Sequence, residues 1–143
     1  MQAIYVLAKS YKSYRSLDRM SGVIKYKEAI AVGLVILYAS LIREPHLRLP
    51  EVAFADKWSH LLAYALLGAT LAWDLIRTQQ KTGLVWLIGM SVPMVYGGAI
   101  EIVQGAFFYP RVAEWMDWIA DVAGTIIGCG LVAGVWQLKN SNI

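Results

Sequence analysis

Apolar runs separated by short polar segments are the main pattern of this chain. Four runs suit membrane-spanning helices, and they cover residues 26–42, 56–75, 82–100 and 115–138. The third is the clearest because it contains no charged residue, and its length is close to the roughly 20 residues that a bilayer requires. The first has a shorter apolar core, 29–42, so we expect it to extend back to Tyr26 while Lys25 and Lys27 reach the headgroups. The pattern predicts an all-α fold, a polytopic bundle of four transmembrane helices.

The polar segments between these runs have the composition of loops and tails. Pro45 and Pro50 break any helix in the first loop. Asp74, Arg77 and Lys81 are expected to form a short polar turn. We therefore divide the chain into a basic tail, a four-helix membrane domain and a short C-terminal tail, at residues 1–26, 27–138 and 139–143.

The distribution of charge predicts the orientation of the bundle. Lys and Arg are concentrated in the N-terminal tail, in the second loop and at Lys139, whereas carboxylates outnumber them around the first and third loops. Because basic residues resist translocation, both termini are predicted to be cytoplasmic and the third loop to face outward. The basic tail is expected either to be solvated or to lie on anionic lipid.

Composition supports the same class of protein. The chain has 143 residues, of which 58% are hydrophobic and only 16% are charged. This is too apolar for a soluble domain of that size, so we expect an integral membrane protein of one domain. The single cysteine, Cys129, excludes an intramolecular disulfide and is expected to be a small buried residue. The sequence has no phosphate-binding loop, dinucleotide fingerprint or nucleic-acid motif, so nucleic acid is not an expected partner and no cofactor is assigned.

Ionisable residues within the apolar runs are the strongest functional signal. Glu101 and Asp121 lie in otherwise membrane-spanning sequence, where a charge costs several kcal/mol unless it faces a partner, a cavity or a substrate. In the predicted topology, the second, third and fourth spans carry their polar ends at the same outer leaflet. The i, i+4 spacing places the members of each of three sets on one helix face: Asp56, His60 and Tyr64; Gly97, Glu101 and Gln104; Asp117, Asp121, Gly124 and Gly128.

These three faces predict one outward-facing polar pocket built by the second, third and fourth spans. The side chains expected to bind a ligand there are Asp56, Lys57, His60, Tyr64, Glu101, Gln104, Arg111, Asp117 and Asp121.

The ordered pattern of these residues resembles a known family. It reads Asp56-Lys57-x-x-His60-x-x-x-Tyr64-x-x-x-Gly68, then Glu101-x-x-Gln104, Arg111, and Asp117-x-x-x-Asp121-x-x-Gly124-x-x-x-Gly128. Over about 29–138 it is similar to VanZ-like membrane proteins, with the difference that the family more often has Asn at the position of Asp121. The resemblance implies a multi-pass protein of the bacterial inner (cytoplasmic) membrane and cell envelope. The founding member is linked to glycopeptide (teicoplanin) resistance, and the resemblance brings no established reaction.

Three hypotheses follow for the predicted pocket. The first is recognition of an anionic lipid-linked headgroup, such as a polyprenyl phosphate or a cell-wall precursor. Lys57, His60 and Arg111 would donate to phosphate, and the carboxylates would orient these cations. Membrane lipid or a lipid-linked headgroup is therefore the expected partner.

The second hypothesis is an intramembrane hydrolase or transferase, with His60, Glu101 and Asp117 as the catalytic candidates. His60 with Glu101 or Asp117 would act as a general acid/base pair. These three residues with Asp121 could alternatively hold a divalent metal, but their spacing matches no metalloenzyme motif, so no metal site is assigned. The third hypothesis is structural: pairs such as Lys57 with Asp117, or His60 with Glu101, would hold the helices together.

Aromatic and small residues have simpler interpretations. Tryptophans near the predicted span ends are expected to anchor the interface: Trp86, Trp115, Trp118 and Trp136. Gly124, Gly128 and Gly134 are expected to permit close helix approach. Pro93, followed by Gly97 and Gly98, predicts a kink or a close helix contact.

Overall fold

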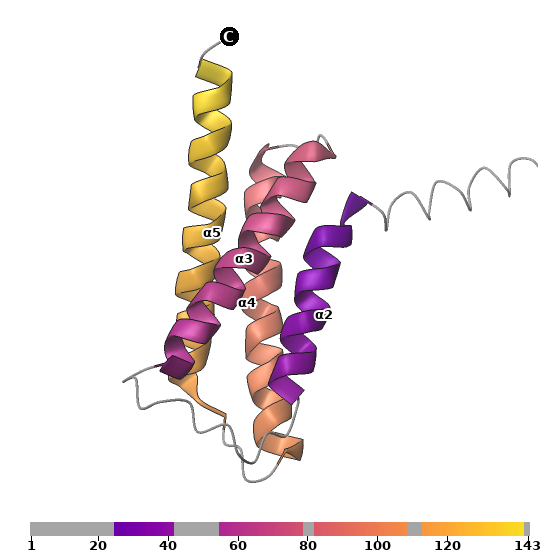
Figure 1. Cartoon of the computed structure of the whole chain (residues 1–143), viewed down its shortest axis with the longest axis vertical. Helices are drawn as coiled ribbons and strands as arrows, with labels where there is room; N and C mark the ends of the chain where they lie inside the picture. Colours follow the sequence, from indigo (N-terminus) through magenta and orange to yellow (C-terminus); the bar gives the residue numbers. More distant parts are fainter. Residues whose placement is uncertain (1–24, 42–54, 79–81, 109–112, 142–143) are drawn as a thin grey trace, which may run out of the picture.

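The structure is a computed structural model that describes residues 25–41, 55–78, 82–108 and 113–141. Within these ranges every regular element is an α-helix (Figure 1). The helices are α2 (Lys27–Leu41), α3 (Ala55–Arg77), α4 (Thr82–Phe107) and α5 (Trp115–Ser141). The predicted all-α class is confirmed, and each helix coincides with one of the apolar runs.

Three of these helices can cross a membrane by length and composition: α3, α4 and α5. The described part of α2 has 15 residues, in keeping with the short apolar core of the first run. α4 is longer than its uncharged run because it continues through Glu101 and Gln104 to Phe107. Both of these polar side chains are buried inside the bundle, so their polarity does not end the helix.

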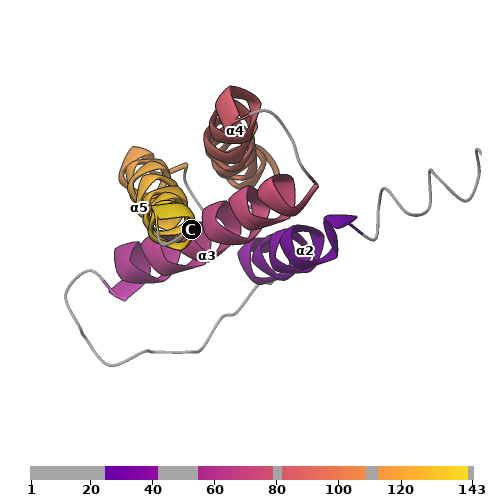
Figure 2. The same cartoon turned by 90° about the horizontal axis from the view of Figure 1, so that it is seen from above.

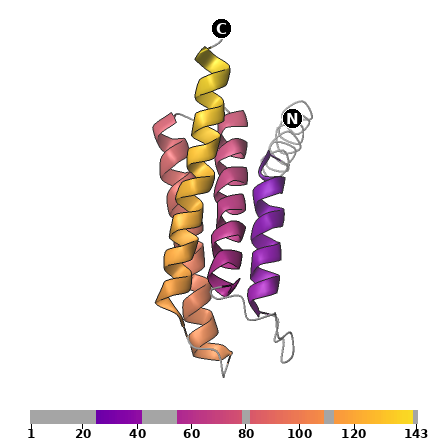
Figure 3. The ribbon, with the colours of Figure 1, turned by 60° about the vertical axis from the view of Figure 1, so that its left-hand side comes forward.

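The helices form a bundle in which α3 has the central place. Seen from above, α3 lies between α5 and α2, and α4 packs beside it (Figure 2). Successive helices run in opposite directions, so the first turns of α3 and α5 lie at the same end as the last turns of α2 and α4 (Figure 3). Large apolar side chains such as Leu62, Val95 and Leu131 remain exposed on the outer faces, as expected where hydrocarbon is the solvent.

Glycines bring α3 and α5 into backbone contact. A Cβ atom added at Gly124 would overlap the carbonyl oxygen of Leu61, and one added at Gly128 would overlap that of Ala65. On α3, a Cβ at Gly68 would lie 3.0 Å from the carbonyl oxygen of Thr125. The expected role of Gly124 and Gly128 in close helix approach is therefore confirmed.

Gly134 does not share this role. Nothing within the described residues lies within 4 Å of a Cβ placed there, so the expectation for this glycine was wrong. Gly134 is exposed, and the C-terminal end of α5 extends beyond α3 (Figure 1).

Asp74 lies in a different environment from the one the sequence suggested. It belongs to the last turns of α3 and is 1% exposed, so the expectation of a polar turn at this residue was wrong. Its Oδ2 accepts a hydrogen bond of 3.3 Å from the backbone N–H of Ala29, in the first turn of α2. Amides of a first turn have no partner within their own helix, and the helix dipole favours a carboxylate there. Asp74 therefore stabilises the start of α2 from a neighbouring helix.

Replacing Asp74 with alanine is expected to lower the unfolding free energy by about 1 kcal/mol, the usual effect of losing a capping acceptor. Thermal unfolding of the purified protein in detergent, followed by circular dichroism, measures this change. Asp74→Asn is the matched control because its amide oxygen can still accept the bond from Ala29. Equal unfolding temperatures for the two variants would contradict this role.

Candidate functional site

Polar side chains from three helices meet at one end of the bundle. The first turns of α3 carry Asp56, Lys57 and His60, and the first turns of α5 carry Asp117 and Asp121. Glu101 and Gln104 lie near the end of α4 at the same end of the molecule (Figure 3). The spacing that predicted three polar faces at one depth is thus realised in space.

Lys57 is surrounded by carboxylates. Its Nζ lies 2.6 Å from Oε2 of Glu114 and 3.4 Å from Oδ2 of Asp56, and it also forms an ion pair with Oδ1 of Asp117. The pair with Asp117 was expected from the sequence, and it is the most buried of the three, since the Asp117 side chain is 9% exposed. The positive charge of Lys57 is therefore balanced within the protein.

His60 is held by the second acidic residue of α5. Its Nδ1 lies 2.9 Å from Oδ1 of Asp121, and its Nε2 lies 4.0 Å from Oδ2 of Asp117. Because a carboxylate accepts hydrogen bonds, Nδ1 carries the proton of this bond. Asp121 is 1% exposed, so this hydrogen bond is shielded from solvent.

The expected pairing of His60 with Glu101 was wrong. Oε2 of Glu101 instead accepts a bond of 3.0 Å from the backbone N–H of Glu114, the residue before α5. The carbonyl oxygen of Glu114 in turn accepts from the N–H of Asp117. Glu101 therefore positions the start of α5 and only indirectly the groups around His60.

Gly97 makes room for the buried acid. A Cβ at this position would lie 2.5 Å from Oδ2 of Asp121 and 3.1 Å from the ring of Tyr64. Thr125 donates to the backbone carbonyl of Asp121 at 2.8 Å, one turn further along α5. The close helix contact predicted around Pro93 and Gly97 is confirmed at Gly97. It buries the Asp121 side chain on the inner side of His60.

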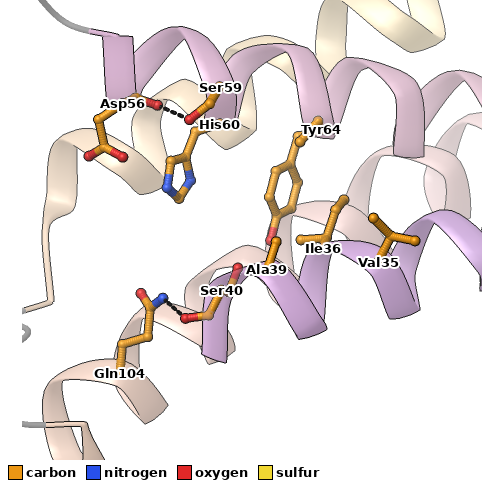
Figure 4. Close-up of a pocket in the computed structure, with 10 residues that line it drawn as sticks. Val35, Ile36, Ala39, Ser40, Asp56, Ser59, His60, Tyr64 and Gln104 are labelled. Atoms are coloured by element: carbon orange, nitrogen blue, oxygen red, sulfur yellow. Dashed lines mark hydrogen bonds between the residues drawn. The ribbon is translucent and has the colours of Figure 1, made fainter. Parts of the chain in front are cut away.

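A pocket of about 250 Å³ lies beside this cluster, between α2, α3 and α4 (Figure 4). One wall is mainly polar, and the other, from α2, is mainly apolar. Nε2 of Gln104 donates to the carbonyl oxygen of Ser40 at 2.7 Å and ties the two walls together. The lining residues are Val35, Ile36, Ala39, Ser40, Asp56, Ser59, His60, Ala63, Tyr64 and Gln104.

The expected pocket between the second, third and fourth spans needs one correction. Four of the predicted α3 and α4 residues line it, Asp56, His60, Tyr64 and Gln104, whereas Lys57 and Glu101 do not. The remaining wall comes from α2 in place of α5. The α5 carboxylates instead contact Lys57 and His60, as described above. The apolar α2 wall could not be recognised because its residues look like ordinary membrane-facing sequence.

The predicted site residues therefore fall into distinct groups. Direct contacts join Asp56, Lys57, His60, Asp117 and Asp121. Tyr64 and Gln104 line the pocket, and Glu101 acts through the backbone of Glu114. Arg111 lies outside the described residues.

Two residues have roles that the sequence did not reveal. Glu114 was not among the candidates, although its position three residues before Asp117 in an acidic stretch was a usable signal. Trp118 was expected to anchor the interface, but it is half-buried, packs against Gly98 and donates from Nε1 to the carbonyl oxygen of Met94 at 2.9 Å. It therefore joins α5 to α4.

Comparison with family models, with curated proteins and with solved structures finds no match to this chain. The class rests on the molecule itself: a helical protein with three helices long and apolar enough to cross a membrane, which indicates a multi-pass membrane protein. Among the described residues at the polar end, carboxylates outnumber the two basic side chains, Lys57 and His60.

Proposed function

We propose that this chain is a multi-pass protein of the bacterial cytoplasmic membrane that binds the anionic headgroup of a lipid or lipid-linked cell-wall precursor in the pocket between α2, α3 and α4. In this proposal α2 is the first of four spans, both termini are cytoplasmic, and the pocket opens at the outer leaflet. The protein would be VanZ-like, and it would affect susceptibility to glycopeptides such as teicoplanin.

The two unlike walls of the pocket are the observation that carries this proposal. His60, Ser59 and Tyr64 offer hydrogen-bonding groups on the α3 side, whereas Val35 and Ile36 offer apolar surface on α2. A headgroup joined to a hydrocarbon chain needs both kinds of contact at once. The volume, about 250 Å³, is slightly below the usual range for a whole small-molecule site, so it suits a headgroup better than an entire lipid.

The basic residues have unequal parts in this proposal. Lys57 is engaged by three carboxylates and does not line the pocket, so it is assigned to the protein's own charge balance. His60 does line the pocket, and it donates to phosphate from Nε2 when the imidazole is protonated. Arg111 remains a predicted phosphate ligand by virtue of its planar fork.

Filling the pocket tests the proposal. Ala39→Phe places a ring in the lining, and it is expected to weaken the binding of polyprenyl phosphate by about tenfold or more, equivalent to about 1.4 kcal/mol. Leu34→Phe is the matched control because Leu34 lies on the same helix, is 60% exposed and does not line the pocket. Native mass spectrometry of the purified protein measures both.

Polyprenol without phosphate provides the control for the headgroup. It should bind at least tenfold more weakly than polyprenyl phosphate if the headgroup is what the pocket recognises. Unchanged affinity of the Ala39→Phe protein, or equal affinity for the alcohol and the phosphate, would refute the proposal.

The His60–Asp121 pair supports a second candidate function, an acid/base enzyme. A carboxylate that holds one imidazole nitrogen orients the ring, while the other nitrogen stays available for proton transfer. Ser59 is not hydrogen-bonded to His60, because its hydroxyl donates to the carbonyl oxygen of Asp56 at 2.6 Å. Release of a product from polyprenyl phosphate that stops in a His60→Gln variant would identify this activity.

A further inference from the structure

We propose that Asp56, His60 and Asp117 form a binding site for a divalent transition-metal ion such as zinc, and that the ammonium group of Lys57 occupies this cation site when the metal is absent. The site opens into the pocket between α2, α3 and α4. Metal binding itself does not depend on the proposed headgroup function, although it would deepen that function if both hold.

The three side chains lie close enough to share an ion after small movements. One ligand atom from each lies within 4.8 Å of the others, and Nε2 of His60 is 4.0 Å from Oδ2 of Asp117. Zinc binds imidazole nitrogen and carboxylate oxygen at about 2.0–2.2 Å in tetrahedral geometry, which places two ligand atoms about 3.4 Å apart. Nε2 of His60 and Oδ2 of Asp117 therefore need to approach each other by about 0.6 Å, which small side-chain rotations allow. The Asp56 side chain is 65% exposed and can rotate to complete the set.

The partner of His60 on its other nitrogen is the second observation that points to a metal. Nδ1 of His60 donates to Asp121 at 2.9 Å, which leaves the lone pair of Nε2 for a ligand. Metal-bound histidines almost always donate their second N–H to a carboxylate, a carbonyl or water, and this bond fixes the ring and its tautomer. Here the carboxylate of Asp121 is buried and packs against Gly97. The imidazole ring is therefore held in its orientation before any metal binds.

Asp117 provides the third observation. Its Oδ1 is buried and pairs with the ammonium of Lys57, while its Oδ2 lies 4.0 Å from Nε2 of His60. The presence of Lys57 shows that this position stabilises positive charge.

The site also has an open side. Asp56 and His60 both line the pocket, whereas Asp117 approaches from α5 behind them. Three protein ligands with one position left for water or a ligand is the arrangement of catalytic rather than structural zinc sites. A metal here would be reachable from the pocket.

A bound metal would also resolve the charge balance of the pocket. The carboxylates around Lys57 and His60 create a negative environment that disfavours a phosphate. A divalent ion held by Asp56, His60 and Asp117 can coordinate phosphate oxygens through its open positions, in place of the direct hydrogen bond from Nε2 of His60. The acidic cluster and an anionic headgroup are then compatible, which is where this inference rests on the proposed function.

Zn²⁺ titration of the purified full-length protein, without added lipid, tests the metal site. Isothermal titration calorimetry should show one ion bound per chain. His60→Gln and Asp117→Asn should each weaken this binding by about tenfold or more, whereas Lys57→Met should strengthen it, because no ammonium has to be expelled. The matched control is His46→Gln, which removes the other histidine of the chain and should leave the affinity unchanged.

A measurement on the unmodified protein does not depend on the folding of any variant. Diethylpyrocarbonate acylates accessible imidazole nitrogen, and Zn²⁺ should protect His60 but not His46, as read by peptide mass spectrometry. Absence of binding to the natural chain, equal affinity of the His60→Gln protein, or binding only after Lys57 is replaced would each overturn the proposal. Loss of lipid binding with intact zinc binding would refute the headgroup function alone.

Discussion

Replacing Gly128 with alanine is expected to lower the unfolding free energy by about 3 kcal/mol or more, because the added methyl group would overlap the backbone of the facing helix. The Cβ atom would fall on the carbonyl group of Ala65 and lie 3.0 Å from the backbone nitrogen of Ala69. Backbone atoms cannot rotate away as a side chain can, so α3 and α5 would have to separate. Unfolding in mixed micelles with increasing dodecyl sulfate measures the loss.

Gly130→Ala is the matched control in the same helix. Nothing in the described chain lies within 4 Å of a Cβ at Gly130, so this variant should be as stable as the parent or slightly more stable, by about 1 kcal/mol at most. If both alanine variants unfold at the same dodecyl sulfate fraction as the parent, the close contact of α3 with α5 does not contribute as described.

Replacing Asp121 with alanine is the second substitution with a large expected effect. It removes the acceptor of the His60 Nδ1 proton and leaves a void beside Gly97 and Tyr64. Removing one partner from a buried charged pair is expected to cost about 3 kcal/mol. The same unfolding measurement in mixed micelles applies.

Asp121→Asn separates the hydrogen bond from the charge. The asparagine oxygen can accept from Nδ1 of His60 in nearly the same geometry, so this variant is expected to stay within about 1 kcal/mol of the parent. A loss as large as that of Asp121→Ala would mean that the negative charge, and not the hydrogen bond and the filled volume, stabilises this part of the bundle.

The helices and their polar faces could be predicted from the sequence because they depend on local regularities. Uninterrupted apolar runs gave the helical segments, and i, i+4 spacing placed His60 with Asp56 and Tyr64 on one face. Lys57 and Asp117 could be paired because each lies in the first turns of a helix at the same end of the bundle.

The partners within the cluster depend on features that spacing does not encode. Whether His60 meets Glu101 or Asp121 is decided by the rotation of α4 and α5 about their axes and by the space above Gly97. The Glu101 carboxylate accepts a hydrogen bond from the backbone N–H of Glu114, and side-chain patterns carry no information about backbone donors.

Two further differences have the same origin in tertiary contacts. Asp74 looked like a residue of a polar turn because it is charged and near a span end. It is buried instead, because its carboxylate accepts a hydrogen bond from a backbone amide in the first turn of α2. The α2 wall of the pocket consists largely of aliphatic side chains, which have the same composition whether they face lipid or a cavity.

The backbone contact of α3 with α5 fixes the register of the two rods against each other. Sliding one past the other by a single turn, about 5.4 Å, would take His60 away from Asp121 and Lys57 away from Asp117 at the same time. The small residues of the α3–α5 contact thus determine how the polar side chains of the two helices are aligned. A substitution in the middle of the bundle can therefore separate the paired side chains at its end without replacing any of them.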